Sequence, residues 1–149
     1  SARAATKRGV PVVVADARDP DVLDRIVRGE DVGTLFLPQG TAMASRKHWI
    51  GFTLKPRGTV LVDAGAAKAV ASGNKSLLPR GVVGVRGDFE AGDPVSIVGP
   101  EGSEVARGLA RYDTRDVSRL AGAQSRDIEA RLGRPGSDEV VHADDLVVV

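Results

Sequence analysis

The order of apolar and polar residues predicts alternating strands and helices in the first part of the chain. Val10–Ala15 is an almost continuous apolar run, typical of a strand that is covered on both faces in an α/β sheet. Asp19-Pro20 provides the N-cap and first residue of a helix that stops at Gly29. Gly33–Leu37 is a second strand. Because two strands cannot form a stable sheet alone, residues 1–42 are predicted to be the remnant of a larger α/β domain.

From Gly58 onward the apolar runs become shorter and turns separate them. Thr59–Val62 is a strand, and Asp63 is a suitable N-cap for a helix over Ala64–Ser72 that ends at Gly73. Closely spaced turns follow at Gly87-Asp88 and Gly92-Asp93, where the aspartates are expected to cap local backbone groups, and such turns favour an antiparallel β-barrel over a parallel sheet. The further strands are expected at Val82–Val85, Pro94–Val98 and Glu104–Arg111, and two short helices near Arg115–Leu120 and Ser125–Leu132.

These patterns divide the chain into four segments. We expect an α/β remnant at residues 1–42, a linker at 43–57, a mixed α+β β-barrel at 58–135 and a C-terminal strand or tail at 136–149. Residues 1–8 have the composition of the end of a helix, alanine-rich and basic in the last turn. The pattern alone leaves two origins equally open for them, a frayed native terminus and a chain that opens inside a longer domain.

The composition mainly excludes certain kinds of site and partner. The chain has no cysteine, so disulfides, thiolate metal sites and cysteine nucleophiles are excluded. Its net charge of +1 supplies no global attraction to nucleic acid, so any such binding needs a local patch. Apolar runs are far shorter than the roughly 20 residues of a membrane span. We therefore expect a cytoplasmic protein with no membrane partner.

Catalytic, cofactor and metal motifs are missing from the sequence. Neither of the two glycine-rich phosphate-binding patterns, G-x-x-x-x-G-K-S/T and G-x-G-x-x-G, occurs in the chain. The glycines at 81, 84 and 87 lie among β-branched residues, which is typical of bends in a barrel. His142 precedes Asp144-Asp145, where a divalent ion with oxygen ligands is the alternative to a solvated acidic turn. The turn is the preferred interpretation. We expect no catalytic, cofactor-binding or metal-binding residue in this chain.

Several basic residues are candidates for binding nucleic acid. Arg46, Lys47 and His48 precede the only tryptophan, Trp49, and combine positive charge with an aromatic face. The alternative for every basic cluster is a solvated or salt-bridged surface, because acidic residues are interspersed. The other candidates are Lys68, Lys75, Arg80, Arg86, Arg107, Arg111, Arg115 and Arg119.

The segment Leu77–Val98, LLPRGVVGVRGDFEAGDPVSIV, resembles the PUA domain, a module best known for binding RNA. This resemblance implies a PUA-like β-barrel in which a groove between the first helix and the nearby strands receives RNA. The positions of this chain that match the groove are Lys68, Lys75 and Arg80.

The flanking sequences RKHWI, ARYDTRDVSRLAG and VVHADDLVVV, with GTLFLPQGT upstream, narrow the resemblance to the glutamate 5-kinase family. That family transfers the γ-phosphoryl group of ATP to the side-chain carboxylate of L-glutamate, with Mg²⁺, in the first step of proline synthesis. Its catalytic motifs would precede Ser1. The resemblance thus implies an inactive C-terminal fragment whose PUA domain serves regulation or oligomerisation. Its expected partners are the missing N-terminal kinase half and further copies of itself. A stand-alone RNA-binding module is the alternative, which the scarcity of aromatic residues in the barrel makes the less favoured one.

Overall fold

A computed structural model of the chain describes residues 5–6, 10–38 and 42–149. These residues form two compact units, Ser1–Arg46 and Lys47–Val149. The predicted helix over residues 1–8 falls mostly outside the described residues, of which Ala5 and Thr6 are helical. Each unit is described separately below.

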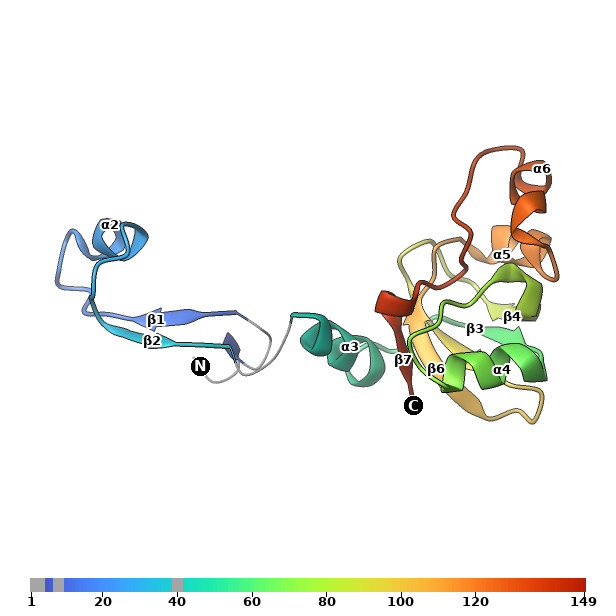
Figure 1. Cartoon of the computed structure of the whole chain (residues 1–149), viewed down its shortest axis with the longest axis horizontal. Helices are drawn as coiled ribbons and strands as arrows, with labels where there is room; N and C mark the ends of the chain where they lie inside the picture. The colour runs from blue at the N-terminus through green and yellow to red at the C-terminus, as the bar shows by residue number, and fades with distance from the viewer. Residues whose placement is uncertain (1–4, 7–9, 39–41) are drawn as a thin grey trace. The chain divides into compact units, whose positions relative to one another are not determined.

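The first unit is built on a two-stranded antiparallel ribbon (Figure 1). β1 (Val12–Val14) pairs with β2 (Thr34–Phe36), and helix α2 (Val22–Val27) lies between them in sequence. Asp21 rather than Asp19 holds the N-cap position, while the Asp19 carboxylate accepts a hydrogen bond from the Asp21 N–H group at 3.1 Å. The helix therefore starts two residues later than the sequence pattern indicates.

The strands of this ribbon do not have the expected cover on both faces. Val14, Leu35 and Leu37 are 53%, 57% and 68% exposed, and α2 has no buried residue. Two strands and one short helix supply no second layer on which to bury these side chains. Residues 1–46 alone therefore do not form the covered α/β layer, and their origin as the remnant of a larger α/β domain stays a prediction.

The segment expected to be a linker contains a helix, α3 (Ala42–Phe52). Its C-terminal half belongs to the second unit, where Ile50 is fully buried and Gly51 lies against Val147. Gly40, Pro56 and Gly58 flank this helix in the sequence, and because such residues are typical of loops, the pattern predicts a linker here.

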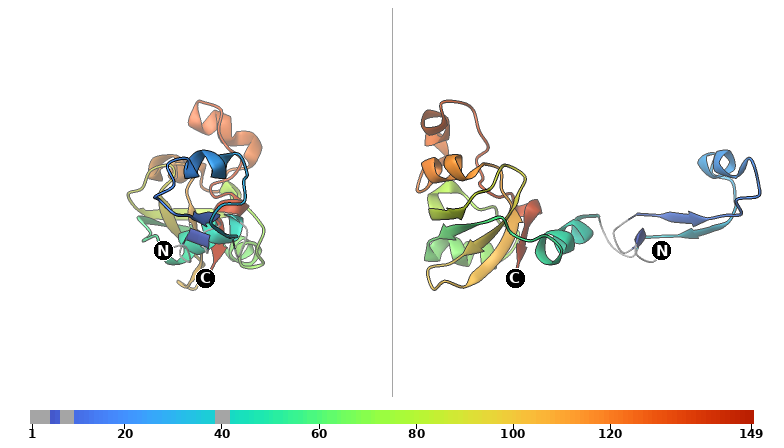
Figure 2. Two further views of the ribbon diagram at one scale, coloured as in Figure 1. Left: turned by 90° about the vertical axis from the view of Figure 1, so that its left-hand side faces the viewer. Right: turned by 180° about the vertical axis from the view of Figure 1, so that it is seen from behind.

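The second unit is a five-stranded mixed sheet with helices (Figure 2). Its strand order is β4-β3-β5-β6-β7. Helix α4 (Ala64–Ala71) follows β3, while α5 (Thr114–Leu120) and α6 (Ile128–Leu132) pack against each other and α5 contacts β4. The strands are β3 (Gly58–Val62), β4 (Val82–Gly87), β5 (Pro94–Val98), β6 (Glu104–Leu109) and β7 (Leu146–Val148).

The predicted mixed α+β fold is confirmed, but the barrel is neither wholly antiparallel nor closed. β3 and β5 are parallel, with Val60 opposite Ile97, and the sheet is open because β4 and β7 form its two edges. The glycine turns after β4 do reverse the chain, at Gly87 and Gly92 with positive φ. However, β5 then crosses to the far side of β3 instead of pairing with β4. Turn residues indicate where a strand reverses but not which neighbour it joins.

The core of the second unit lies between the sheet and its helices. Val60, Ile97 and Ala106 from the sheet, and Val117 and Leu120 from α5, are completely buried. This core is aliphatic, in line with the 3% aromatic content, and Phe89 is its largest fully buried side chain. The burial holds α4 and the segment leading into β4 in fixed positions, and these two elements form the groove described next.

Candidate functional site

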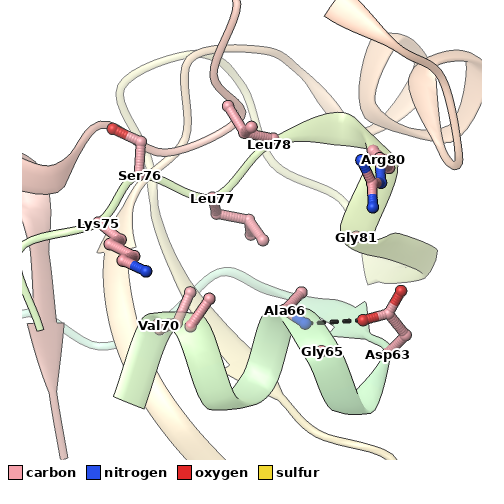
Figure 3. A pocket seen from close by; sticks show the side chains of 11 residues that line it. Asp63, Gly65, Ala66, Val70, Lys75, Ser76, Leu77, Leu78, Arg80 and Gly81 are labelled. Atoms are coloured by element: carbon pink, nitrogen blue, oxygen red, sulfur yellow. Dashed lines mark hydrogen bonds between the residues drawn. The ribbon is translucent and has the colours of Figure 1, made fainter. Parts of the chain in front are cut away.

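A groove of about 320 Å³ lies between helix α4 and the segment that leads into β4 (Figure 3). Asp63, Ala66 and Val70 line it on the helix side, and Lys75, Leu77 and Arg80 line it on the other. In Figure 3 the Lys75 side chain lies at one end of the groove and Arg80 at the other, with the Asp63 carboxylate on the Arg80 side. The groove thus combines an apolar floor with two cations and one carboxylate.

The N-terminus of α4 is locked against the start of β4. The Asp63 carboxylate accepts a hydrogen bond from the Ala66 N–H group at 2.7 Å, which is the N-cap predicted from the sequence. The Asp63 N–H group donates to the Gly81 carbonyl at 3.0 Å. A Cβ atom at Gly81 would overlap the Ala66 methyl group, so glycine permits this close approach.

The floor of the groove is held by contacts to the C-terminal segment. Leu77 is buried and forms an isolated antiparallel bridge with Val141, to whose carbonyl its N–H group donates at 2.8 Å. The Ser76 hydroxyl accepts a hydrogen bond from the Ala143 N–H group at 3.0 Å. Residues far apart in sequence therefore set the shape of the groove.

The three residues predicted to contact RNA are placed differently. Lys75 and Arg80 line the groove, while Lys68 lies exposed on α4 and outside its lining. No aromatic side chain is among the lining residues. The structure thus brings two of the three predicted cations to one groove, where the Asp63 carboxylate is also present.

The remaining basic candidates are dispersed over the second unit. Arg107 is committed to an ion pair with Glu104, and Arg111 lies 4.0 Å from Asp145. Arg115 and Arg119 are exposed on α5, and Arg86 is exposed on β4. These arginines do not form a single cationic surface, because Glu104 and Asp145 lie beside two of them.

The acidic turn near the C-terminus has a local structural role. The Nδ1 atom of His142 accepts a hydrogen bond from the Asp144 N–H group at 3.1 Å and caps the short 3₁₀ helix Ala143–Asp145. Across residues 5–6, 10–38 and 42–149 there is no group of three or more His, Asp or Glu residues arranged to hold a metal ion. Over the same residues no helix is both long and apolar enough to cross a membrane.

A polar relay on β5 and β6 was missed from the sequence. The Arg107 guanidinium donates to the Glu104 carboxylate at 2.8 and 3.1 Å, and the Ser96 hydroxyl donates to the same carboxylate at 2.6 Å. Residues three apart on a regular strand point to opposite faces. Here Ala106 pairs with Ile97 and Glu104 with Val98, so Val105 is an extra bulged residue that returns Glu104 and Arg107 to one face. The strand alternation in the sequence gives no sign of this bulge.

The ion pair between Glu104 and Arg107 makes the free energy of unfolding of the second unit depend on pH in the acidic range. The hydrogen bonds from Arg107 lower the pKa of Glu104, partly opposed by burial and assisted by Ser96. The stabilisation is therefore present above the ordinary pKa of about 4.5 and is lost as the pH falls through the lowered value. Glu104→Gln is expected to cost about 1 kcal/mol or less at pH 7, since the pair is partly exposed, and almost nothing at an acidic pH well below the lowered pKa of Glu104. Urea unfolding at both pH values measures the difference, and an equal cost at both would contradict it.

Comparison with known proteins identifies the second unit. A family model described as the PUA domain matches residues 58–132, just over half of the chain. The chain belongs to the PUA domain family. A solved PUA domain from Aeropyrum pernix K1, in complex with tartrate, is 33% identical and covers 58% of this chain and 43% of that one, with a TM-score of 0.42. The PUA domain begins at β3 and ends with α6, and it includes the groove beside α4.

The similarity to curated proteins extends beyond the PUA domain. A glutamate 5-kinase from Trichlorobacter lovleyi is 48% identical over all 149 residues, and one from Myxococcus xanthus is 47% identical over the same length. This chain spans 40% of the length of each of these relatives. It therefore matches glutamate 5-kinases along its whole length, and it corresponds to their C-terminal part.

Proposed function

We propose that this chain is the C-terminal part of a glutamate 5-kinase, which transfers the γ-phosphoryl group of ATP to the side-chain carboxylate of L-glutamate. The observation that carries the proposal is that 48% identity runs over all 149 residues, including the first unit, which lies outside the PUA match. A PUA domain that had been joined to an unrelated protein would not share residues 1–46 with these kinases.

The residues of this chain do not themselves fit the nucleotide or the metal. Phosphoryl transfer depends on groups that position phosphates and on a divalent cation. The sequence holds no phosphate loop, and the part of the chain that the structure describes has no cluster of metal ligands. ATP and Mg²⁺ are therefore assigned to the part of the kinase that this chain lacks. In this proposal the enzyme works in the cytoplasm, in keeping with the absence of cysteine.

The exposed apolar side chains of the first unit favour contact with another part of the same protein. Val14, Leu35 and Leu37 are more than half exposed on a two-stranded ribbon, an arrangement that leaves strand edges free to recruit a neighbour. In the proposed kinase this neighbour is the N-terminal half. Association of the separated chain with further copies of itself, through the same residues, stays a prediction.

A chimera tests the kinase proposal. This chain replaces the corresponding segment of the T. lovleyi enzyme, and ADP release that depends on glutamate is measured. We expect activity comparable to that of the parent enzyme, and none from the chain alone, because its residues cannot position ATP. A folded but inactive chimera would contradict the proposal, as would glutamate-dependent ADP release from the chain by itself.

RNA binding in the α4 groove is the second candidate function, favoured by the two cations that line the groove. The Asp63 carboxylate and the absence of aromatic lining oppose it, because single-stranded RNA is bound through stacking as well as charge. We expect that neutralising Lys68, Lys75 and Arg80 together changes the affinity for structured RNA by no more than about threefold and leaves the salt dependence nearly unaltered. Anisotropy titrations at several salt concentrations measure both. Sub-micromolar, sequence-selective binding that this triple substitution abolishes would make the groove an RNA site.

A further inference from the structure

The α4 groove contains three charged side chains that do not neutralise one another. Lys75 and Arg80 are exposed on one wall and Asp63 on the other (Figure 3). Among the residues that the structure describes, the side chains of Lys75 and Arg80 have no hydrogen-bond or ion-pair partner. The Asp63 carboxylate accepts one hydrogen bond, from the Ala66 N–H group, and a carboxylate can accept about four. All three charged groups are therefore able to contact a ligand.

The placement of these charges defines the ligand that would match them. At one end of the groove the Asp63 carboxylate and the Arg80 guanidinium lie on opposite walls without forming an ion pair with each other. A ligand between them has to offer a cation to Asp63 and an anion to Arg80. Lys75, at the other end, requires a second anion, and the apolar floor at Leu77 favours methylene groups in the middle.

The length and volume of the groove suit a small molecule. From Asp63 to Val70, helix α4 rises about 10 Å. An extended chain of five carbons is about 5 Å long. A hydrogen bond at each end adds about 3 Å, so such a chain spans the groove. The volume of about 320 Å³ lies at the lower end of the range of small-molecule sites.

We propose that the α4 groove binds an α-amino acid with an acidic side chain, of the length of glutamate. Its ammonium group donates to the Asp63 carboxylate, and its α-carboxylate accepts from the Arg80 guanidinium. Its methylene groups lie on Leu77, and its side-chain carboxylate accepts from Lys75. Asp63, which repels the phosphates of RNA, is in this site the group that recognises the ligand. The inference rests on the groove alone and does not depend on the kinase proposal.

Nuclear magnetic resonance of the isotope-labelled full chain measures this binding directly. L-Glutamate is titrated at constant ionic strength, and the amide signals of Gly65, Ala66 and Gly81, which line the groove, are followed. We expect saturable shifts with a dissociation constant of the order of millimolar, because exposed ion pairs contribute little. Glutamine lacks the anion for Lys75, and glutarate lacks the cation for Asp63. Each should bind at least about threefold more weakly than glutamate.

Two variants assign the charges to their partners. Lys75→Met should weaken glutamate binding about three- to fivefold and leave glutamine binding nearly unchanged. Asp63→Asn keeps a residue that caps helices well, and it should remove the preference for glutamate over glutarate. Lys68→Met is the matched control, because Lys68 is exposed on α4 outside the groove lining, and it should not alter the affinity.

Several results would overturn the proposal. These are the absence of saturable shifts, equal affinities for glutamate, glutamine and glutarate, and equal losses in Lys75→Met and Lys68→Met. Oligouridine that shifts the same amide signals at lower concentrations than glutamate would assign the groove to RNA instead.

Discussion

Replacing Phe89 with alanine is expected to lower the free energy of unfolding of the second unit by about 3–5 kcal/mol. Phe89 is only 1% exposed and is the largest fully buried side chain, so its removal leaves a cavity in an aliphatic core. The surrounding chain cannot collapse easily into this cavity. The Phe89 N–H group donates to the Thr114 hydroxyl at 2.9 Å, and the Thr114 N–H group donates to the Phe89 carbonyl at 3.0 Å.

Urea unfolding followed by far-ultraviolet circular dichroism measures this loss. Phe52→Ala is the matched control, because it removes the same ring from a position that is 71% exposed. The control should change stability by about 0.5 kcal/mol or less. Similar losses for the two variants would contradict the described core.

The Gly108→Ala substitution is expected to destabilise the second unit by about 1–3 kcal/mol. A Cβ atom at Gly108 would overlap the Val141 Cγ1 atom and lie 2.9 Å from the Asp145 carbonyl oxygen. Gly108 pairs with Leu146, so the new methyl group would press β6 away from the edge strand β7 and from the segment that bridges to Leu77. A backbone carbonyl cannot move aside as a flexible side chain can.

Gly84→Ala on β4 is the control for Gly108→Ala. A Cβ atom at Gly84 would lie 3.6 Å from the Leu61 Cδ1 atom, which is an ordinary van der Waals contact. Both substitutions add one methyl group to a strand, so any general effect of alanine on strand stability cancels between them. Thermal or urea unfolding of the two variants side by side measures the difference, and equal stability would show that β6 and β7 are not packed as described.

Predictions that depend on neighbouring residues agree well with the structure. Asp63 was predicted to cap a helix that ends at Gly73, and its carboxylate does accept the Ala66 N–H group at 2.7 Å. Asp93, expected to satisfy local backbone groups in a turn, accepts the Glu90 N–H group at 3.0 Å. In both cases the two partners are three residues apart, so the interaction forms wherever the chain lies in the fold.

Predictions that depend on distant partners agree less well. The turns favoured an antiparallel barrel over a parallel sheet, whereas β5 joins β3 in parallel. The helix in the supposed linker is stabilised by Arg107, which is 56 residues from the carbonyl that it caps. The groove candidates separate for the same reason, since Lys75 and Arg80 converge through the packing of Leu77 on Val141 while Lys68 stays outside.

The sequence by itself determined the kind and approximate limits of the elements, the helix cap at Asp63, the turns at Gly87 and Gly92, and the resemblance to PUA domains and glutamate 5-kinases. These follow from chemistry between residues a few positions apart and from motifs whose order is preserved along the chain. Only the tertiary structure decided the open mixed sheet, the lining of the α4 groove and the helix within the supposed linker. Each of these depends on which apolar surfaces are buried together, and that burial is shared among segments whose separation in sequence leaves no local sign of their contact.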